Sequence, residues 1–188
     1  MASEVKNSNT VEIFSYIARD QKSSVVKGEI KAIEERIVLE QLKKIGLDFR
    51  SIRFPGVISY DTVPSGGTTD YAPQMINNAK KGEKFECNLS PNTELPFIGI
   101  DKTISSIIDV MDLEIIESKL RAFNVQEASF SVNELSDFLS QKFPSFQITY
   151  NEDKSFQSVA DTWPSSLNCS KANKFWNFST EKDFELFL

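Results

Sequence analysis

The stretch LDFRSIRFPGVISYDTVPSGGTTDY, from Leu47 to Tyr71, decides how the rest of the chain is interpreted. Its first eight residues alternate between apolar and polar side chains, which predicts a strand over Leu47 to Phe54, and Pro55-Gly56 ends that strand. The following loop contains Gly66-Gly67, and a helix is predicted from Tyr71 to Lys80. A strand that leads through a long loop into a helix is typical of an α/β protein with function in its loops.

Alternating elements are expected on both sides of this stretch. Upstream, Val11 to Ala18 predicts a short buried strand, and the apolar spacing from Ile30 to Ile45, stopped by Gly46, predicts a helix. Helices are expected to outnumber strands. The remaining predictions are strands at Lys84–Asn88, Arg121–Val125 and Phe146–Tyr150, a turn at Ser90–Thr93, helices at Lys102–Met111 and, with a capping box, Ser131–Ser140, and helical turns at Glu152–Ala160, Ser170–Trp176 and Glu181–Leu188.

The composition excludes several classes of protein and site. With 188 residues, a net charge of −6 and no stretch of ~20 apolar residues, the chain is expected neither to bind nucleic acid nor to span a membrane. It contains no histidine, so a Ser-His-Asp triad or a histidine-ligated zinc site cannot form. Cys87 and Cys169 lie too far apart in sequence for a redox pair, and we expect no metal site.

The quoted stretch resembles the short-chain L-threonine 3-dehydrogenases, which belong to the NAD-dependent epimerase/dehydratase group of extended short-chain dehydrogenases. The combination of GGTTDY with a distant DTWP segment carries most of the resemblance. It continues through GEKFECNLSPNTELPF (Gly82 to Phe97), FQITY (Phe146 to Tyr150), Ala160 to Pro164, and Ser170, Ala172 and Trp176.

The resemblance implies an α/β fold of which only a part is present. Members of the family bind NAD through a glycine-rich turn in a Rossmann unit, but the seven glycines here form no GxGxxG pattern. We therefore expect a partial Rossmann-like parallel sheet remnant (11–56) plus the C-terminal α/β substrate-binding lobe (57–188), in one α/β unit after a loose segment (1–10). NAD is the implied cofactor, and we do not expect this chain to bind it alone.

The family's catalytic pair is a Tyr four residues before a Lys. Counting back from Gly46, the resemblance places the Lys at Lys31, which also contacts the cofactor in the family, and it places Lys27 where the Tyr belongs. The literal match Tyr150 to Lys154 follows the FQITY strand and is read as accidental. Ser15 or Tyr16 is the counterpart of the family's catalytic Ser or Thr. We expect the chain to be inactive on its own.

The residues on the substrate side match the family better. The resemblance assigns the amino-acid substrate to Thr68, Thr69, Asp70 and Trp163, and it places Pro55-Gly56 near the cofactor's nicotinamide. A structural reading stays open beside this one. In that reading Gly66-Gly67 and Pro55-Gly56 only form turns, Thr68 caps the Tyr71 helix, and Trp163 belongs to the core.

Two functions remain open at this stage. The chain is the substrate-binding part of a protein that oxidises the threonine 3-hydroxyl by hydride transfer to NAD, or it is a non-catalytic binding partner derived from that family. We expect a homo- or hetero-dimer through the Ile30 to Ile45 helix, and a threonine-like small molecule as ligand. The sequence leaves the compartment open between mitochondrial and cytoplasmic. The C-terminal aromatic residues are expected to pack against the lobe: Phe175, Trp176, Phe178, Phe184 and Phe187.

Overall fold

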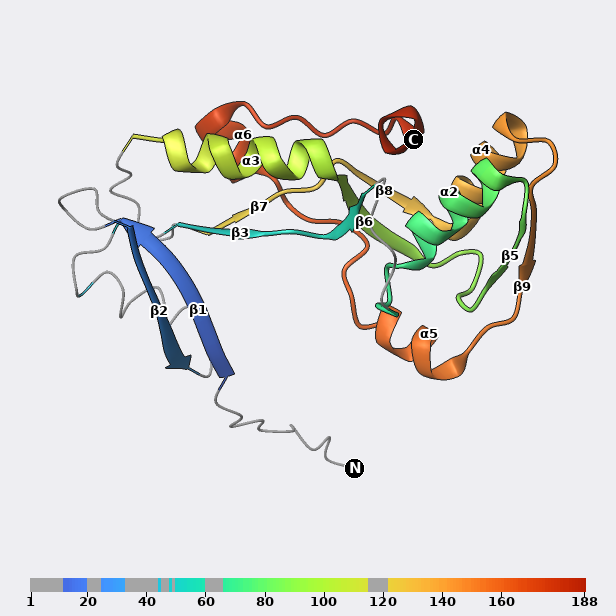
Figure 1. Cartoon of the computed structure of the whole chain (residues 1–188), viewed down its shortest axis with the longest axis horizontal. Helices are drawn as coiled ribbons and strands as arrows, with labels where there is room; N and C mark the ends of the chain where they lie inside the picture. The colour runs from blue at the N-terminus through green and yellow to red at the C-terminus, as the bar shows by residue number, and fades with distance from the viewer. Residues whose placement is uncertain are drawn as a thin grey trace. The chain divides into compact units, whose positions relative to one another are not determined.

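The computed structural model describes residues 12–19, 25–32, 44, 48, 50–59, 66–114 and 122–188 (Figure 1). The chain divides into two compact units. The first comprises Met1–Ser51 and Glu114–Arg121, and the second comprises Ile52–Leu113 and Ala122–Leu188. The functional division of the chain at residue 56 stays a prediction.

The first unit contains an antiparallel pair of strands, β1 (Glu12–Arg19) and β2 (Val25–Ala32). The strand predicted from Val11 is confirmed as β1. The helix predicted from Ile30 is wrong at its start, because Ile30 to Ala32 belong to β2 and pair with Phe14 to Glu12. Pairing with β1 supplies the backbone hydrogen bonds of VVKGEIKA, whose valines and glycine disfavour a helix. The rest of the expected helix, 33–43 and Ile45, lies outside the described residues, and Lys44 is helical.

The second unit is built on short strands in three groups. The largest sheet has the order β4-β6-β8, in which β4 (Gly56–Ile58) runs parallel to β6 (Glu94–Gly99) and β8 (Ala128–Ser131) runs antiparallel to β6. Two further pairs are β5 (Lys84–Cys87) with β9 (Gln147–Tyr150), which are parallel, and β3 (Ser51–Arg53) with β7 (Ala122–Asn124). The fold is therefore α/β with small, partly parallel sheets.

The sequence pattern misses four strands, β2, β4, β6 and β8. Nine strands stand against five α-helices and one 3₁₀-helix with described bounds, so the expectation that helices outnumber strands is wrong. Strand β6, ELPFIG, contains Pro96 and is buried along almost its whole length, so it shows no alternation. Strand β8 has only four residues. Each is held by pairing with distant chain, which a local pattern does not report.

The helices agree more closely with the prediction. The six, all in the second unit, are α2 (Tyr71–Lys81), α3 (Ile100–Asp112), α4 (Val132–Lys142), α5 (Lys154–Ala160), α6 (Ser170–Trp176) and η1 (Phe184–Phe187). Helix α2 ends at Gly82, which has the left-handed φ of +70° that favours glycine. At α4 the predicted capping box is confirmed, because the Ser131 hydroxyl accepts from the Glu134 N–H and the Glu134 carboxylate accepts from the Ser131 N–H.

Aromatic side chains form the centre of the main core. The rings of Phe97 and Phe130 stack with centroids 4.5 Å apart, and Phe184 and Phe187 from the C-terminal segment pack on Phe130. A second cluster gathers Ile98 with residues of α6 and its flanks. The prediction that the C-terminal aromatic residues pack against the lobe is confirmed. The two cysteines are free and buried, Cys87 in the main core and Cys169 in the second cluster.

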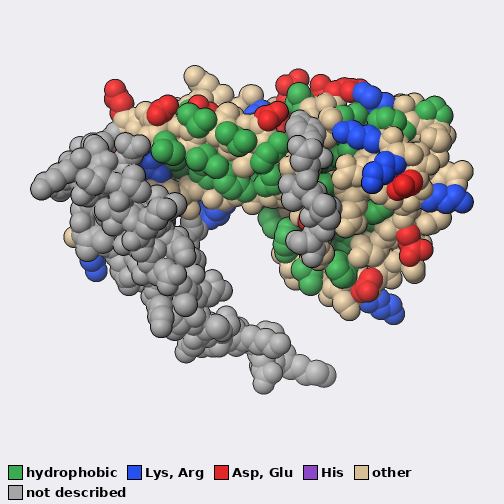
Figure 2. Space-filling model, in the orientation of Figure 1, with side chains coloured by type: hydrophobic (Ala, Val, Ile, Leu, Met, Phe, Trp, Pro, Cys, Tyr) green, Lys and Arg blue, Asp and Glu red, His purple; other side chains and the backbone are tan. Residues whose placement is uncertain are grey.

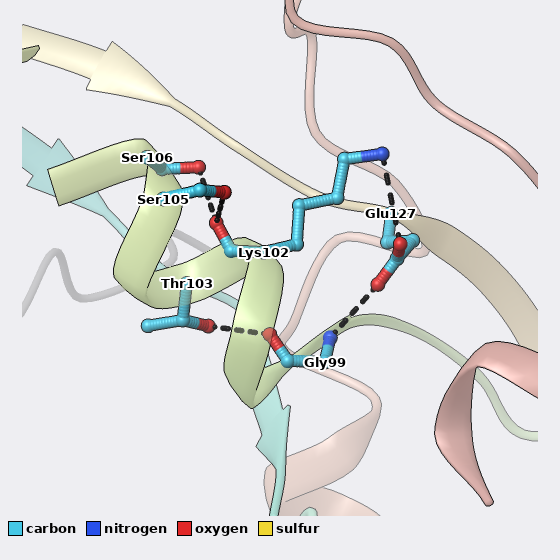
Figure 3. A network of polar contacts seen from close by, with 6 residues as sticks. All are labelled: Gly99, Lys102, Thr103, Ser105, Ser106 and Glu127. Carbon is cyan, nitrogen blue, oxygen red and sulfur yellow. Dashed lines mark hydrogen bonds and ion pairs between the residues drawn. The ribbon is translucent and has the colours of Figure 1, made fainter. Parts of the chain in front are cut away.

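The junction between β6 and α3 is held by the buried side chain of Glu127 (Figure 3). Its Oε2 accepts from the Gly99 N–H at 3.0 Å, and its Oε1 lies 3.6 Å from the half-buried ammonium of Lys102. Its backbone N–H donates to the Phe97 carbonyl, and its carbonyl accepts from Glu181. Glu127 thus joins β6, the first turn of α3 and the C-terminal segment.

We predict that Glu127→Ala lowers the free energy of unfolding by about 2 kcal/mol, because it leaves the buried Gly99 N–H without its acceptor and Lys102 without its counter-ion. Urea titration measures the change. The matched control is Glu181→Ala, which removes an exposed carboxylate from the residue that bonds to Glu127 through its backbone. Equal losses in the two variants would contradict the role of the buried carboxylate.

The capping box of α4 predicts a pH dependence. The Lys182 ammonium and the Ser131 N–H hold the pKa of Glu134 below its usual range. A lowered folded pKa stabilises the protein above the unfolded pKa of about 4.3, and this contribution is lost as pH falls through the folded value. The stability difference between the natural protein and Glu134→Gln should therefore be present at neutral pH and shrink in acid. A difference that grows in acid would contradict this sign.

Candidate functional site

The loop before α2 is closed by the carboxylate of Asp70. Its Oδ2 accepts from the N–H groups of both Gly66 and Gly67, each at 2.8 Å, and its own N–H donates to the Gly67 carbonyl. Gly66 has a φ of +102°, a conformation that favours glycine. The structure therefore gives Asp70, which the resemblance assigns to the substrate, a role in shaping the loop that carries Thr68 and Thr69.

Strand β4 begins against this loop at Gly56. A Cβ atom built on Gly56 would lie 2.9 Å from the Thr69 Cβ and 2.7 Å from a carbon of the Phe97 ring. Only glycine allows this approach, since real Cβ atoms essentially never come so close. The structure thus places Gly56, expected near the cofactor, directly beside Thr69, expected to hold the substrate. Thr68 and Thr69 are half-buried at this junction.

The structural alternatives for two of these residues are wrong. Asp70, not Thr68, is the N-cap residue of α2, so Thr68 does not cap the helix. The side chain of Trp163 is 42% exposed just after α5 and is not a core residue. The turn interpretation of Gly66-Gly67 agrees with the backbone, and a pocket shared by Trp163 and the threonines stays a prediction.

The expected catalytic pair does not lie on a helix. Lys27 and Lys31 are both in β2, where they pair with Ile17 and Ile13 of β1. Residues four apart in a strand are about 13 Å apart along the chain, whereas one helical turn separates them by about 6 Å. The backbone of β2 therefore does not reproduce the family's Tyr-Lys arrangement at these two positions.

The literal match Tyr150 to Lys154 does not lie on one helix either. Tyr150 ends β9 and Lys154 begins α5, in agreement with the reading of this match as accidental. Ser15 and Tyr16 lie in β1, and their role stays a prediction.

Three buried ionisable groups of the second unit, Tyr71 and the two cysteines, are poorly suited to acid-base work. The hydroxyl of Tyr71 is buried without a hydrogen-bond partner beside the Phe97 ring, and burial together with Cys87 raises the pKa of this phenol. Burial likewise raises the pKa of the Cys87 and Cys169 thiols. These groups stay protonated at neutral pH and do not supply a nucleophile or base. Among the described residues no group of His, Cys, Asp and Glu is arranged to hold a metal ion.

Several carboxylates of the second unit lie near helix starts and accept backbone N–H groups there. Asp70 accepts backbone N–H groups before α2, Glu127 does so at Gly99 before α3, and Glu134 and Asp153 do so at α4 and α5. Side chains cap the first turns of α4 and α5, whereas α2 and α3 have no side-chain cap. Carboxylates near these starts disfavour a bound anion because like charges repel. In the described parts of the chain, no helix has the length and apolar character needed to cross a bilayer.

Comparison with known proteins gives a consistent result. No protein-family model matches the chain. It is 40% identical over 166 residues to a protein from Sus scrofa named L-threonine 3-dehydrogenase, mitochondrial, a match that covers 88% of this chain and 44% of the relative. An uncharacterised epimerase/dehydratase of Staphylococcus haemolyticus is 29% identical over 164 residues, covering 87% of this chain and 52% of that protein.

Solved structures show the same partial match. The L-threonine dehydrogenase of Clostridium difficile superposes with a TM-score of 0.73 at 35% identity, over 80% of this chain and 48% of that one. The chain thus spans about half the length of the curated relatives and solved structures that it matches. It is therefore a homologue of part of the L-threonine 3-dehydrogenases of the epimerase/dehydratase family.

Proposed function

We propose that this chain is the substrate-binding lobe of an L-threonine 3-dehydrogenase-like fold, which binds a threonine-like amino acid at the Gly66 to Asp70 loop and does not oxidise it alone. The observation that carries the proposal is the contact between Gly56 and Thr69, which joins the start of β4 to the predicted substrate loop. The names of the relatives support threonine as the amino acid.

The geometry of the loop suits hydroxyl recognition. The Asp70 carboxylate fixes the backbone by accepting hydrogen bonds from two N–H groups, and Thr68 and Thr69 are held half-buried just before α2. Threonine offers a 3-hydroxyl, an ammonium and a carboxylate, and a pre-shaped loop lowers the cost of ordering polar groups around such a small ligand.

Oxidation of the bound amino acid requires a hydride acceptor. In the family this is NAD, and the glycine-rich turn that holds its phosphates is not found in this sequence. The proposed lobe therefore depends on the portion of the relatives that the chain does not match. Lys27 and Lys31 lie in strand β2. They support the same view, because the family's proton relay needs a phenol close to its lysine, and Lys27 stands where that phenol would be.

A second proposal is that the chain serves as a non-catalytic binding partner. The exposed apolar side chains of α3 favour it, because contiguous apolar surface of this kind marks interaction sites. The dimer expected through Ile30 to Ile45 stays a prediction.

We predict that L-threonine binds to the isolated chain and that Thr69→Val weakens binding about tenfold, because the substitution removes one hydroxyl and keeps the shape of the side chain. Titration calorimetry, or chemical-shift changes in the Thr69 region, measures the affinity. The matched control is Thr149→Val, an exposed threonine of β9. Threonine and NAD together should give no NADH with this chain alone.

Two results would contradict the proposed function. Binding that Thr69→Val and Thr149→Val weaken equally would place the ligand elsewhere. NADH formation by the purified chain would show that it oxidises threonine without the unmatched portion.

A further inference from the structure

The ring of Phe97, in the middle strand β6, borders the loop from Gly66 to Asp70, which we call the substrate loop. Gly56 of β4 is its partner in the parallel register, and a Cβ atom built on Gly56 would lie 2.7 Å from the Phe97 Cε1 and 2.9 Å from the Thr69 Cβ. The ring also meets Tyr71, the first residue of α2, edge to face with centroids 5.8 Å apart. Phe97 therefore packs beside both the loop and the helix into which the loop leads.

The aromatic core holds the Phe97 ring in place. The ring stacks on Phe130 with centroids 4.5 Å apart, and Phe184 and Phe187 of the C-terminal segment pack on Phe130 in turn. Unlike the hydrophobic side chains visible on the surface in Figure 2, those of Phe97 and Phe130 are fully buried. Buried side chains are close-packed and keep their rotamers, so Phe97 is a fixed support for whatever lies against it.

The absence of a side chain at Gly56 turns this support into a constraint on the loop. Both the Phe97 ring and Thr69 enter the space that a Cβ atom of residue 56 would fill. A ring that covers a glycine on the neighbouring strand is a known way to stabilise that glycine. A shift of the ring into or out of this shared space changes the room left for Thr69.

The contact with Tyr71 acts on the other end of the loop. The hydroxyl of Tyr71 is buried without a hydrogen-bond partner among the described residues, so packing of its ring positions this side chain. The first turn of α2 is tied to the loop by the backbone, because the Ala72 N–H donates to the Thr69 carbonyl at 3.2 Å. Phe97 thus supports Thr69 from two directions.

We infer that Phe97 is a positioning residue for the amino-acid ligand: its ring, stacked on Phe130, fixes Thr69 against Gly56 and Tyr71 at the start of α2. It sets the affinity for the ligand by holding the loop in its binding shape, since a pre-ordered loop lowers the cost of binding. This inference rests on the proposed function, because it takes the loop to be where the amino acid binds.

The first test compares Phe97→Leu with Phe123→Leu in calorimetric titration with L-threonine. Phe123 is the matched control, because it is a fully buried phenylalanine of strand β7 that packs on Phe175 and Trp176. Phe97→Leu should weaken binding about tenfold, and Phe123→Leu should leave it unchanged. Urea titration gives the folded fraction of each variant, and unfolding raises the apparent dissociation constant only by the reciprocal of that fraction.

The second test uses the space at Gly56. Gly56→Ala places a methyl group there and should weaken binding about tenfold, whereas Phe97→Leu removes Cε1, the nearest ring atom. If the two residues act through one space, the double variant should bind no more weakly than Gly56→Ala alone. Independent effects would multiply to about a hundredfold.

The third test reads the loop without a ligand. The N–H groups of Asp70 and Ala72 donate to carbonyls of the loop. Their hydrogen exchange should be about fivefold faster in Phe97→Leu than in Phe123→Leu, because the support of the loop is lost in the first variant only.

Three results overturn the inference: equal dissociation constants for the two leucine variants, effects that multiply in the double variant, or equal exchange of the loop amides. Failure of the natural protein to bind threonine overturns the proposed function instead. The exchange comparison needs no ligand, so it still decides whether Phe97 holds the loop.

Discussion

The buried carboxylate of Glu127 is the interaction on which the second unit depends. It sits where β6 ends and α3 begins, and a buried charge is tolerated only when its oxygens are paired. Gly99 and Lys102 provide that pairing, while the Glu127 backbone bonds to Phe97 and Glu181. Glu127 thus ties the end of β6 and the first turn of α3 to the C-terminal segment.

Acidic side chains also accept backbone N–H groups near other helix starts of the second unit. Asp70, Glu127, Glu134 and Asp153 each accept backbone N–H groups close to a helix start. Such carboxylates stabilise the backbone there and disfavour an anion beside them. In the function proposed above, the described lobe supplies hydroxyls near Thr69, and the nucleotide is held by another part of the fold.

Helix α3 buries small residues and exposes large apolar ones. Its small buried residues allow it to lie close to β4 and β6, and its isoleucines remain outside. Exposed apolar area of this kind costs free energy in water unless another surface covers it. The second unit has its own aromatic core around Phe97 and Phe130, which does not include these isoleucines.

The sequence by itself determined the features that depend on neighbouring residues: α2 with its Gly82 end, the Ser131 capping box, and the turn at Gly66-Gly67. These signals are local, because a cap or a positive φ involves only a few consecutive residues. Tertiary structure alone decided the strands β4, β6 and β8, whose hydrogen bonds come from distant chain. It also decided the close approach of Gly56 to Thr69 and the exposure of the isoleucines of α3, because burial depends on which surfaces the folded chain brings together.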